Sequence, residues 1–154
     1  MEDLARVLRD HPFLADLEAE NVDFMVGCAA NLVFRPGELV LREGERADGL
    51  YLVRAGQVAL EVDVPRRGRT RVETLEAGDV MGWSWLFDPD HWLADARAVT
   101  VVRAFRFDGR CLVDKFETDP RLGFRIAKKL LVAAHRRLER ARLQSFDVFA
   151  EARS

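Results

Sequence analysis

The sequence predicts a mainly β fold, an antiparallel sandwich or roll with flanking α-helices. Between Leu32 and Asp108, short runs of Val, Leu, Phe and Tyr alternate with turn signals about every 8–12 residues. Outside that stretch, apolar residues recur at steps of three and four, the spacing of amphipathic helices. The 154 residues are 49% hydrophobic, enough apolar mass for one core, so we expect a single domain over residues 1–154.

Two short helices are expected at the N-terminal end, within residues 1–30. Helical spacing covers residues 2–9 and 13–29, and the pair His11-Pro12 separates the two stretches. The predicted strands occupy residues 31–108. Their turn signals are Pro36-Gly37, Glu43-Gly44, Ala55-Gly56, Arg67-Gly68, Ala77-Gly78 and the stretch from Asp88 to Asp90.

Helices are expected again over residues 109–145, followed by a tail at 146–154. After Asp119-Pro120 one long helix is predicted, because apolar and small residues continue at helical spacing without an internal proline. Between Arg121 and Arg142 there are eight Lys or Arg residues and one acidic residue, a local charge of +7. This helix therefore combines an apolar stripe with a basic face.

The remaining composition narrows the class of protein. The formal net charge is −2, so only a local patch could attract nucleic acid or an anionic membrane. No apolar run approaches the roughly 18 residues of a membrane span, and the acidic start does not resemble a secretory signal, so a cytoplasmic location is expected. Cys28 and Cys111 lie far apart without metal-binding spacing, and we expect them to be buried free thiols.

Four short motifs occur in order along the predicted strands. They are Phe34-x-Pro36-Gly37-Glu38, Glu43-Gly44-x-x-Ala47, Leu50-Tyr51-Leu52-Val53-x-x-Gly56-x-Val58 and Leu75-x-x-Gly78-Asp79-x-x-Gly82. This order resembles the cyclic-nucleotide-binding domain family, in particular the sensor domains of Crp/Fnr-like regulators. The resemblance covers nearly the whole chain. It implies an eight-stranded antiparallel double-stranded β-helix, or jelly roll, with N-terminal helices and a long C-terminal helix.

The nucleotide site of that family is altered in this sequence. The resemblance implies a Gly-Glu pair whose carboxylate holds the ribose hydroxyl, and a later Arg that pairs with the cyclic phosphate. Here Trp83 follows Gly82 where the Glu is expected, and alignment of Ala96-Arg97-Ala98 places Trp92 where the Arg is expected. Loss of one partner of a buried charged hydrogen bond costs about 2–5 kcal/mol, so cyclic-nucleotide binding is disfavoured.

Two interpretations of the tryptophans remain open. Trp83, Trp85 and Trp92 fill the vacated space with apolar bulk, or they line a pocket for a flat or apolar ligand. In the second case Ser84, His91 and Arg97 would be polar anchors. The candidate ligand-binding residues are Gly82, Trp83, Ser84, Trp85, His91, Trp92 and Arg97.

Catalysis and metal binding are not expected. No Ser, Cys or Lys nucleophile stands in a recognisable motif, and no carboxylate pair lies in an apolar setting. His91 could ligate a haem iron, as some relatives of this family do, but no second ligand is indicated. We therefore predict no metal site and assign no cofactor, with a cyclic nucleotide as a disfavoured candidate.

The long C-terminal helix is the expected site of homodimerisation. The equivalent helix pairs with its twin in the resembling regulators, and the predicted stripe here is Ile126, Leu130, Ala134, Leu138 and Ala141. The basic face is either solvated or binds an anionic partner. Transcription regulators of the family carry a helix-turn-helix domain after this helix, whereas the sequence stops at Ser154, so sequence-specific DNA binding by that route is not expected.

The sequence thus favours a non-catalytic regulatory or sensor module with a degenerate phosphate-binding site, which binds another ligand or a protein partner. One alternative is a genuine receptor for cAMP or cGMP that uses Ser84 and Arg97. A second is a structural assembly subunit with a tryptophan-filled core.

Overall fold

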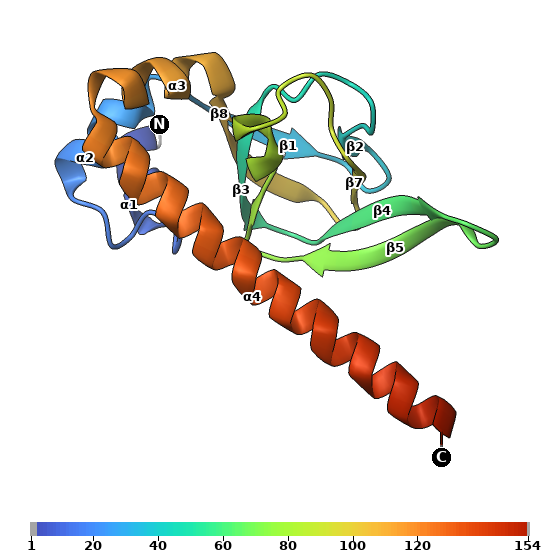
Figure 1. Ribbon diagram of the computed structural model, residues 1–154. Coiled ribbons are helices and arrows are strands. Elements are labelled where there is room, and N and C mark those ends of the chain that lie inside the picture. The colour runs from blue at the N-terminus through green and yellow to red at the C-terminus, as the bar shows by residue number, and fades with distance from the viewer. Residues whose placement is uncertain (1–2, 154) are drawn as a thin grey trace.

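The computed structural model describes residues 3–153, with side chains described through residue 145. Two short helices precede eight strands, and two further helices follow them (Figure 1). The helices are α1 (Leu4–Asp10), α2 (Ala19–Val26), α3 (Gly109–Thr118) and α4 (Pro120–Arg153). The strands and the single 3-10 helix are β1 (Ala29–Phe34), β2 (Leu39–Leu41), β3 (Gly49–Ala55), β4 (Val58–Val64), β5 (Gly68–Leu75), β6 (Val80–Met81), η1 (Trp83–Leu86), β7 (Asp95–Ala98) and β8 (Val102–Asp108).

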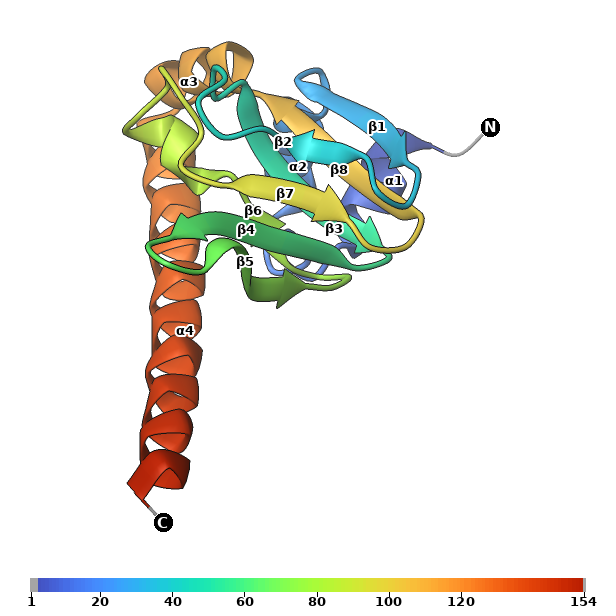
Figure 2. The same ribbon diagram turned by 90° about the vertical axis from the view of Figure 1, so that its right-hand side faces the viewer.

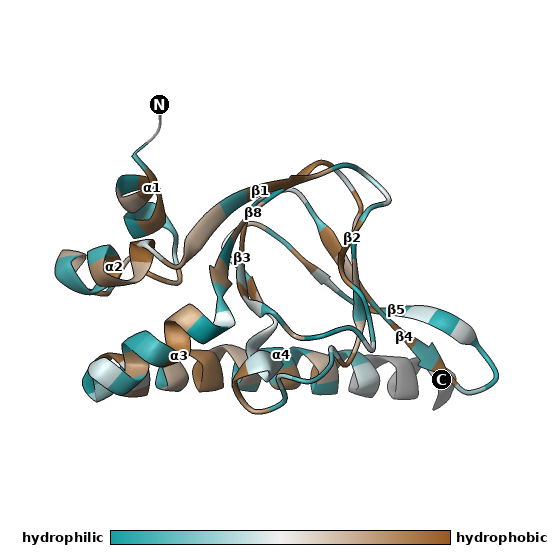
Figure 3. Cartoon of the chain, turned by 90° about the horizontal axis from the view of Figure 1, so that it is seen from above, coloured by the Kyte–Doolittle hydropathy of each residue, from teal (hydrophilic) through white to brown (hydrophobic). Residues whose placement is uncertain are grey.

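The strands form two four-stranded antiparallel sheets, ordered β1-β8-β3-β6 and β2-β7-β4-β5, which face each other (Figure 3). Strands β3 and β8 contribute buried side chains to both faces of their sheet. On one face the ring of Phe105 meets His11 of the N-terminal segment, and on the other Tyr51 meets Trp92 inside the roll. The predicted eight-stranded roll with flanking helices is therefore confirmed.

The turn between β3 and β4 requires a glycine. Gly56 has a φ of +91°, in the left-handed region that side chains disfavour. A Cβ at this position would also collide with the carbonyl oxygen of Val101. The pair Ala55-Gly56 is thus a turn signal with a direct steric cause.

The second predicted helix is shorter than its pattern indicated. Apolar spacing predicted a helix over 13–29, whereas α2 begins at Ala19. Before it the chain forms successive turns, in which the N–H of Leu14 donates to the carbonyl of His11 and that of Leu17 to the carbonyl of Leu14, at 2.9 and 3.0 Å. Both leucines are buried. The three-residue spacing of His11, Leu14 and Leu17 therefore reflects successive tight turns and not a continuous helix.

The last helix is longer than predicted. α4 continues beyond residue 145 to Arg153, through the segment that the sequence assigned to a tail, while Ser154 lies outside the described residues. Its first half lies along the roll and its second half extends past it (Figure 2). Ile126 and Leu130, predicted to lie in a dimer interface, are instead buried against the core of their own chain. That part of the dimer prediction is wrong, because side chains of the same chain, including those of α3, already cover these two residues.

The two cysteines form a disulfide, which corrects the expectation of free thiols. Cys28 and Cys111 are bonded across 83 positions of sequence, with their Cα atoms 5.5 Å apart. The pairing of β1 with β8 brings them together, because it places Cys28 beside Asp108, whose N–H donates to the Cys28 carbonyl at 2.8 Å. Cys111 follows in the first turn of α3. The bond thus joins the start of the roll to the helix that leaves it.

Over the residues that the structure describes, no helix combines the length and the apolar character needed to cross a lipid bilayer.

Candidate functional site

A small cavity lies where η1, the segment before β7 and α4 meet. Four of the candidate ligand-binding residues, Gly82, Trp83, Ser84 and Trp92, line it together with Arg137 of α4. Its volume is about 160 Å³. Small-molecule sites in proteins usually measure about 300–1,000 Å³. The space that remains is therefore smaller than a nucleotide-sized ligand needs.

Trp92 occupies most of this region. Its residue is only 4% exposed, and its ring lies so close to Gly82 that a Cβ there would come within 2.9 Å of the indole. Gly82 also has a φ of +82°, so two independent constraints require glycine at the start of η1. On its other side the indole meets Tyr51 edge to face, with ring centroids 6.2 Å apart.

The backbone around Trp92 is also held on both sides. Its N–H donates to the carbonyl of Glu45 at 2.7 Å, and its carbonyl accepts from the N–H of Gly44 at 3.0 Å. Asp95, three residues later, accepts from the N–H of Glu43 at 2.7 Å and pairs with Arg69. Burial alone would raise the pKa of Asp95, but these two partners hold it below its ordinary value. The indole is thus fixed by a loop that has little freedom to withdraw.

Tyr51, whose ring contacts Trp92, also has its hydroxyl group engaged in a hydrogen bond. Its hydroxyl donates to the carboxylate of Asp48 at 3.0 Å. Burial, reinforced by the charge of Asp48, raises the pKa of this phenol well above its ordinary value. Tyr51 therefore stays neutral and supplies packing to the indole, with no free hydrogen-bonding group for a ligand.

Trp83 takes part in a contact that the sequence did not indicate. The guanidinium of Arg137 lies over the Trp83 ring, 4.2 Å from its centroid. The same side chain, 11% exposed, donates to both carboxylate oxygens of Glu73 on β5 at 2.7 and 2.9 Å, and to the carbonyl of Val80 at 2.7 Å. Arg137 therefore fastens α4 to the roll directly above the cavity.

Chemically, the cavity offers little to a cyclic phosphate. Among its described lining residues, Arg137 is the only cation. Its donors are already engaged by Glu73 and Val80, and a phosphate could recruit them only by separating Arg137 from Glu73. A buried phosphate needs a fixed cationic partner, or its desolvation outweighs the contacts that it gains. Among the described lining residues, Ser84 provides the one hydroxyl group that could contact a phosphate.

Three predicted pocket residues lie elsewhere. Trp85 is buried against the backbone of Gly109 at the start of α3 and does not line the cavity. His91 is exposed, with Nε2 3.6 Å from the Asp88 carboxylate. Arg97 donates to Glu61 at 3.1 Å and to the carbonyl of Gly37 at 2.8 Å.

The placement of Arg97 has a simple cause. Its neighbours Ala96 and Ala98 are buried, so strand alternation directs the Arg97 side chain to the outside of the roll. The Ala-Arg-Ala pattern carried this signal, and the expectation of Arg97 as a pocket anchor is corrected. No comparable sequence signal marked Arg137 or Glu73, which lie 64 positions apart.

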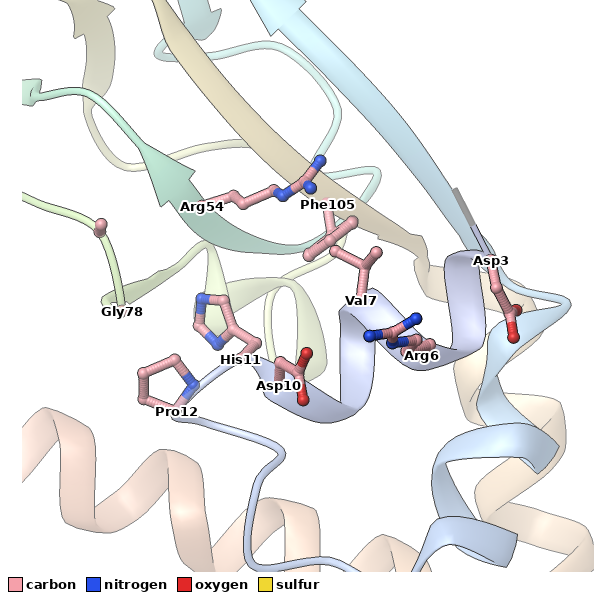
Figure 4. Close-up of a pocket in the computed structure, with 10 residues that line it drawn as sticks. Asp3, Arg6, Val7, Asp10, His11, Pro12, Arg54, Gly78 and Phe105 are labelled. Carbon is pink, nitrogen blue, oxygen red and sulfur yellow. The ribbon is translucent and has the colours of Figure 1, made fainter. Parts of the chain in front are cut away.

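A larger cavity lies between α1, β3 and the turn before β6, away from Trp92 (Figure 4). Its volume is about 880 Å³, and its charged lining residues are Asp3, Asp10, Arg6 and Arg54. Acidic and basic groups balance there. His11 is buried at its edge, where Nε2 lies 2.8 Å from the carbonyl of Val53 and Nδ1 accepts from the N–H of Phe13 at 3.1 Å.

These two contacts fix His11 as the neutral tautomer with its proton on Nε2. Burial lowers the pKa of this histidine from its ordinary value. His11 is therefore a structural link between the N-terminal turn and β3. Among the side chains that the structure describes, through residue 145, no three His, Cys, Asp or Glu residues lie together in a way that could hold a metal ion.

Comparison with known proteins gives a consistent result. Residues 31–119 match the family model of the cyclic nucleotide-binding domain. Over 76 residues the chain is 34% identical to a cAMP-dependent protein kinase regulatory subunit from Yarrowia lipolytica. That alignment covers 49% of this chain but only 19% of the relative, so the chain corresponds to a minor part of that protein.

Two solved structures extend the match to nearly the whole chain. A protein from Geobacter metallireducens, named for cyclic nucleotide binding, is 28% identical with a TM-score of 0.77, and 90% of this chain and 99% of that chain are covered. The N-terminal domain of a transcriptional regulator from Streptomyces coelicolor is 27% identical with a TM-score of 0.65, and the covered shares are 90% and 94%.

Proposed function

The chain belongs to the cyclic nucleotide-binding domain family, and from that premise we propose that it is a non-catalytic regulatory module whose nucleotide site is degenerate. The observation that carries this proposal is the packing of Trp92 between Gly82 and Tyr51, which leaves a cavity of about 160 Å³. Regulation would then act through α4 and its partners and not through a cyclic nucleotide held in the roll.

The relatives support the regulatory part of this proposal. By name, one is a kinase regulatory subunit and another is a domain of a transcriptional regulator. The side chains around the cavity support the degenerate site, since its one cation is already paired with Glu73. The cavity's described lining also holds no Cys, Lys or carboxylate, which favours a role without catalysis.

The test is calorimetric titration of the purified protein with cAMP and with cGMP. We expect no saturable binding below millimolar concentration, because the position of the phosphate partner is filled by an indole. Micromolar binding would contradict the proposal and favour a genuine receptor. Thermal unfolding gives an independent readout, since a ligand at a hundred times its Kd adds about 2.7 kcal/mol to stability.

A restored site makes the same test sharper. The double variant Trp83→Glu, Trp92→Arg returns the carboxylate and the guanidinium to the two family positions and enlarges the cavity. We expect it to gain cyclic-nucleotide affinity of at least about tenfold. His91→Arg is the matched control, because it adds an arginine next to Trp92 at an exposed position outside the cavity lining. A gain in the control of equal size would show that added charge alone is responsible.

Homodimerisation is the second part of the proposal. Because Ile126 and Leu130 are buried, the proposed interface uses a different, exposed face of α4. An exposed seam follows a heptad pattern that begins at Phe124 and continues through Leu131 and Leu138, which are 70%, 71% and 49% exposed. Alanines occupy the intervening positions, so two such helices could approach closely. The complete seam is Phe124, Ala127, Leu131, Ala134, Leu138 and Ala141. The last three belonged to the predicted stripe.

Sedimentation equilibrium tests this interface. We expect the wild-type chain to dimerise, because monomeric proteins rarely leave a contiguous apolar stripe in water. Leu131→Glu should shift it to monomer by placing two like charges at the seam. Val33→Glu is the control, because Val33 is 55% exposed on β1, away from α4. A monomeric wild type, or dissociation by both variants alike, would contradict this interface.

A cytoplasmic location stays a prediction, and the disulfide makes it testable. Structural disulfides are rare in reducing compartments. Alkylation of intact cells with a thiol reagent, followed by mass spectrometry, would report the state of Cys28 and Cys111. Free thiols would support the predicted location, whereas a bonded pair would argue for an oxidising compartment.

A further inference from the structure

A third cavity, a strongly basic groove, runs along α4 on the side of the N-terminal turns. It lies between this helix, the turns around Phe13 and Asp16, and the turn that leads into β6. Its volume is about 650 Å³, about four times that of the cavity beside Trp92 and within the usual range of small-molecule sites. Figure 1 shows the N-terminal turns and the first half of α4 side by side, which is where the groove forms.

The described lining of the groove includes six cationic side chains and two carboxylates. The cations are Arg125, Lys128, Lys129, Arg136, Arg137 and Arg140. The carboxylates are those of Asp16 and Asp79. Asp79 accepts from the N–H of Glu76 at 2.8 Å and thereby closes a turn. The lining as a whole thus carries a formal excess of four positive charges.

Several of these cations have no partner among the described residues. Lys129 pairs with Asp16, and its hydrogen bond lowers the pKa of that carboxyl group. Arg137 and Arg140 share Glu73, at 2.7 and 3.8 Å. Lys128 and Arg136 make no hydrogen bond or ion pair within the part of the chain that the structure describes. A concave surface with uncompensated positive charge favours an anion.

The groove also has apolar walls. Pro12 and Phe13 form one side, and Val132 and Ala133 of α4 contribute to the other. The side chains of Lys129 and Phe13 meet, with the ammonium 5.3 Å from the ring centroid. Charged donors beside apolar walls suit a compact anion better than an extended, fully solvated chain.

From these observations we propose that the groove binds a small soluble anion with two or more linked phosphate groups, such as inorganic pyrophosphate or a nucleoside diphosphate. Two phosphates can engage the unpaired Lys128 and Arg136 together. Of the lining residues that the structure describes, the groove shares only Arg137 with the cavity beside Trp92, and the proposal does not depend on whether that cavity binds a cyclic nucleotide.

Arg137 links the two regions, because it lines both of them. An anion in the groove competes with Glu73 for the guanidinium that now lies over Trp83. Occupancy would therefore weaken the attachment of α4 to β5 and change the surroundings of one indole. Most of the dimer seam, centred on Leu131, lies on the far side of α4 from the groove, whereas Phe124 at its start belongs to both. A dimer would therefore border the groove at Phe124 and leave most of its lining open.

The experiment is calorimetric titration with inorganic pyrophosphate and with adenosine diphosphate, with tryptophan emission recorded in parallel. We expect saturable binding that weakens with salt and that orthophosphate competes with only poorly. The double variant Lys128→Gln, Arg136→Gln should bind at least about tenfold more weakly. Arg121→Gln, Arg142→Gln is the matched control, because it removes the same charge from exposed positions of α4 outside the groove.

The outcomes separate the parts of the proposal. Absence of saturable binding by either anion up to 10 mM would overturn it, as would equal weakening in the control variant. An emission change that disappears in Trp83→Phe, while the binding heat persists, would support the role of Arg137. Binding with no emission change in the wild type would overturn that role. Retention of pyrophosphate affinity by Trp83→Glu, Trp92→Arg would show that the two sites are distinct.

Discussion

Removal of the Cys28–Cys111 disulfide should destabilise the protein strongly. The bond closes a loop of 83 positions, and it limits the conformations of the unfolded chain. The loop-entropy relation gives about 4.5 kcal/mol for a loop of this length, and native disulfides typically contribute about 2–4 kcal/mol. For a chain of 154 residues, the larger value corresponds to a fall in Tm of about 9–18 °C.

Guanidinium unfolding followed by circular dichroism measures this effect. The oxidised wild type is compared with Cys28→Ala, Cys111→Ala, and each protein is measured with and without dithiothreitol. Reductant should lower the midpoint of the wild type to that of the variant and should leave the variant unchanged, so the variant controls for other effects of the reductant. The single variant Cys111→Ser should resemble the double variant.

Mass spectrometry of the alkylated protein decides what a negative result means. Equal midpoints for wild type and variant, with the disulfide shown to be intact, would refute the loop-entropy argument. Free thiols in the air-oxidised wild type would instead refute the adjacency of β1 and α3 that brings Cys28 and Cys111 together.

Three further predictions concern the packing around the roll. Trp92→Ala should lower the free energy of unfolding by about 3–5 kcal/mol, measured by denaturant titration, because it empties the space beside Gly82; a loss below 1 kcal/mol would contradict tight packing. Arg137→Met should cost about 1.5–3 kcal/mol and increase hydrogen exchange along α4, and unchanged exchange would argue against its role in holding the helix. Burial lowers the pKa of His11, so the unfolded chain binds a proton that the native chain resists, and stability should fall as pH drops below about 6.5; His11→Gln should remove up to about 1.4 kcal/mol per pH unit of that slope, and an unchanged slope would assign it to other groups.

The sequence by itself determined the architecture and the composition of the altered site. The turn glycines, exemplified by Gly56 with its positive φ, mark where strands reverse, and these are local requirements. Trp83 could be assigned to the altered site because it directly follows Gly82 in the motif, and Trp92 because of its distance from the aligned Ala96-Arg97-Ala98. Local chemistry and motif spacing are both encoded over short stretches of chain.

Only the tertiary structure decided which faces are free and which distant residues meet. The apolar stripe of α4 gave no indication that the core of the same chain would bury Ile126 and Leu130 and leave Phe124 and Leu131 in water. Helical periodicity defines a face but not its partner. Arg137 meets Glu73 across 64 positions, and the disulfide spans 83, because strand pairing and helix docking bring them together. Such contacts depend on how strands pair and how helices dock, and a short stretch of sequence does not specify either.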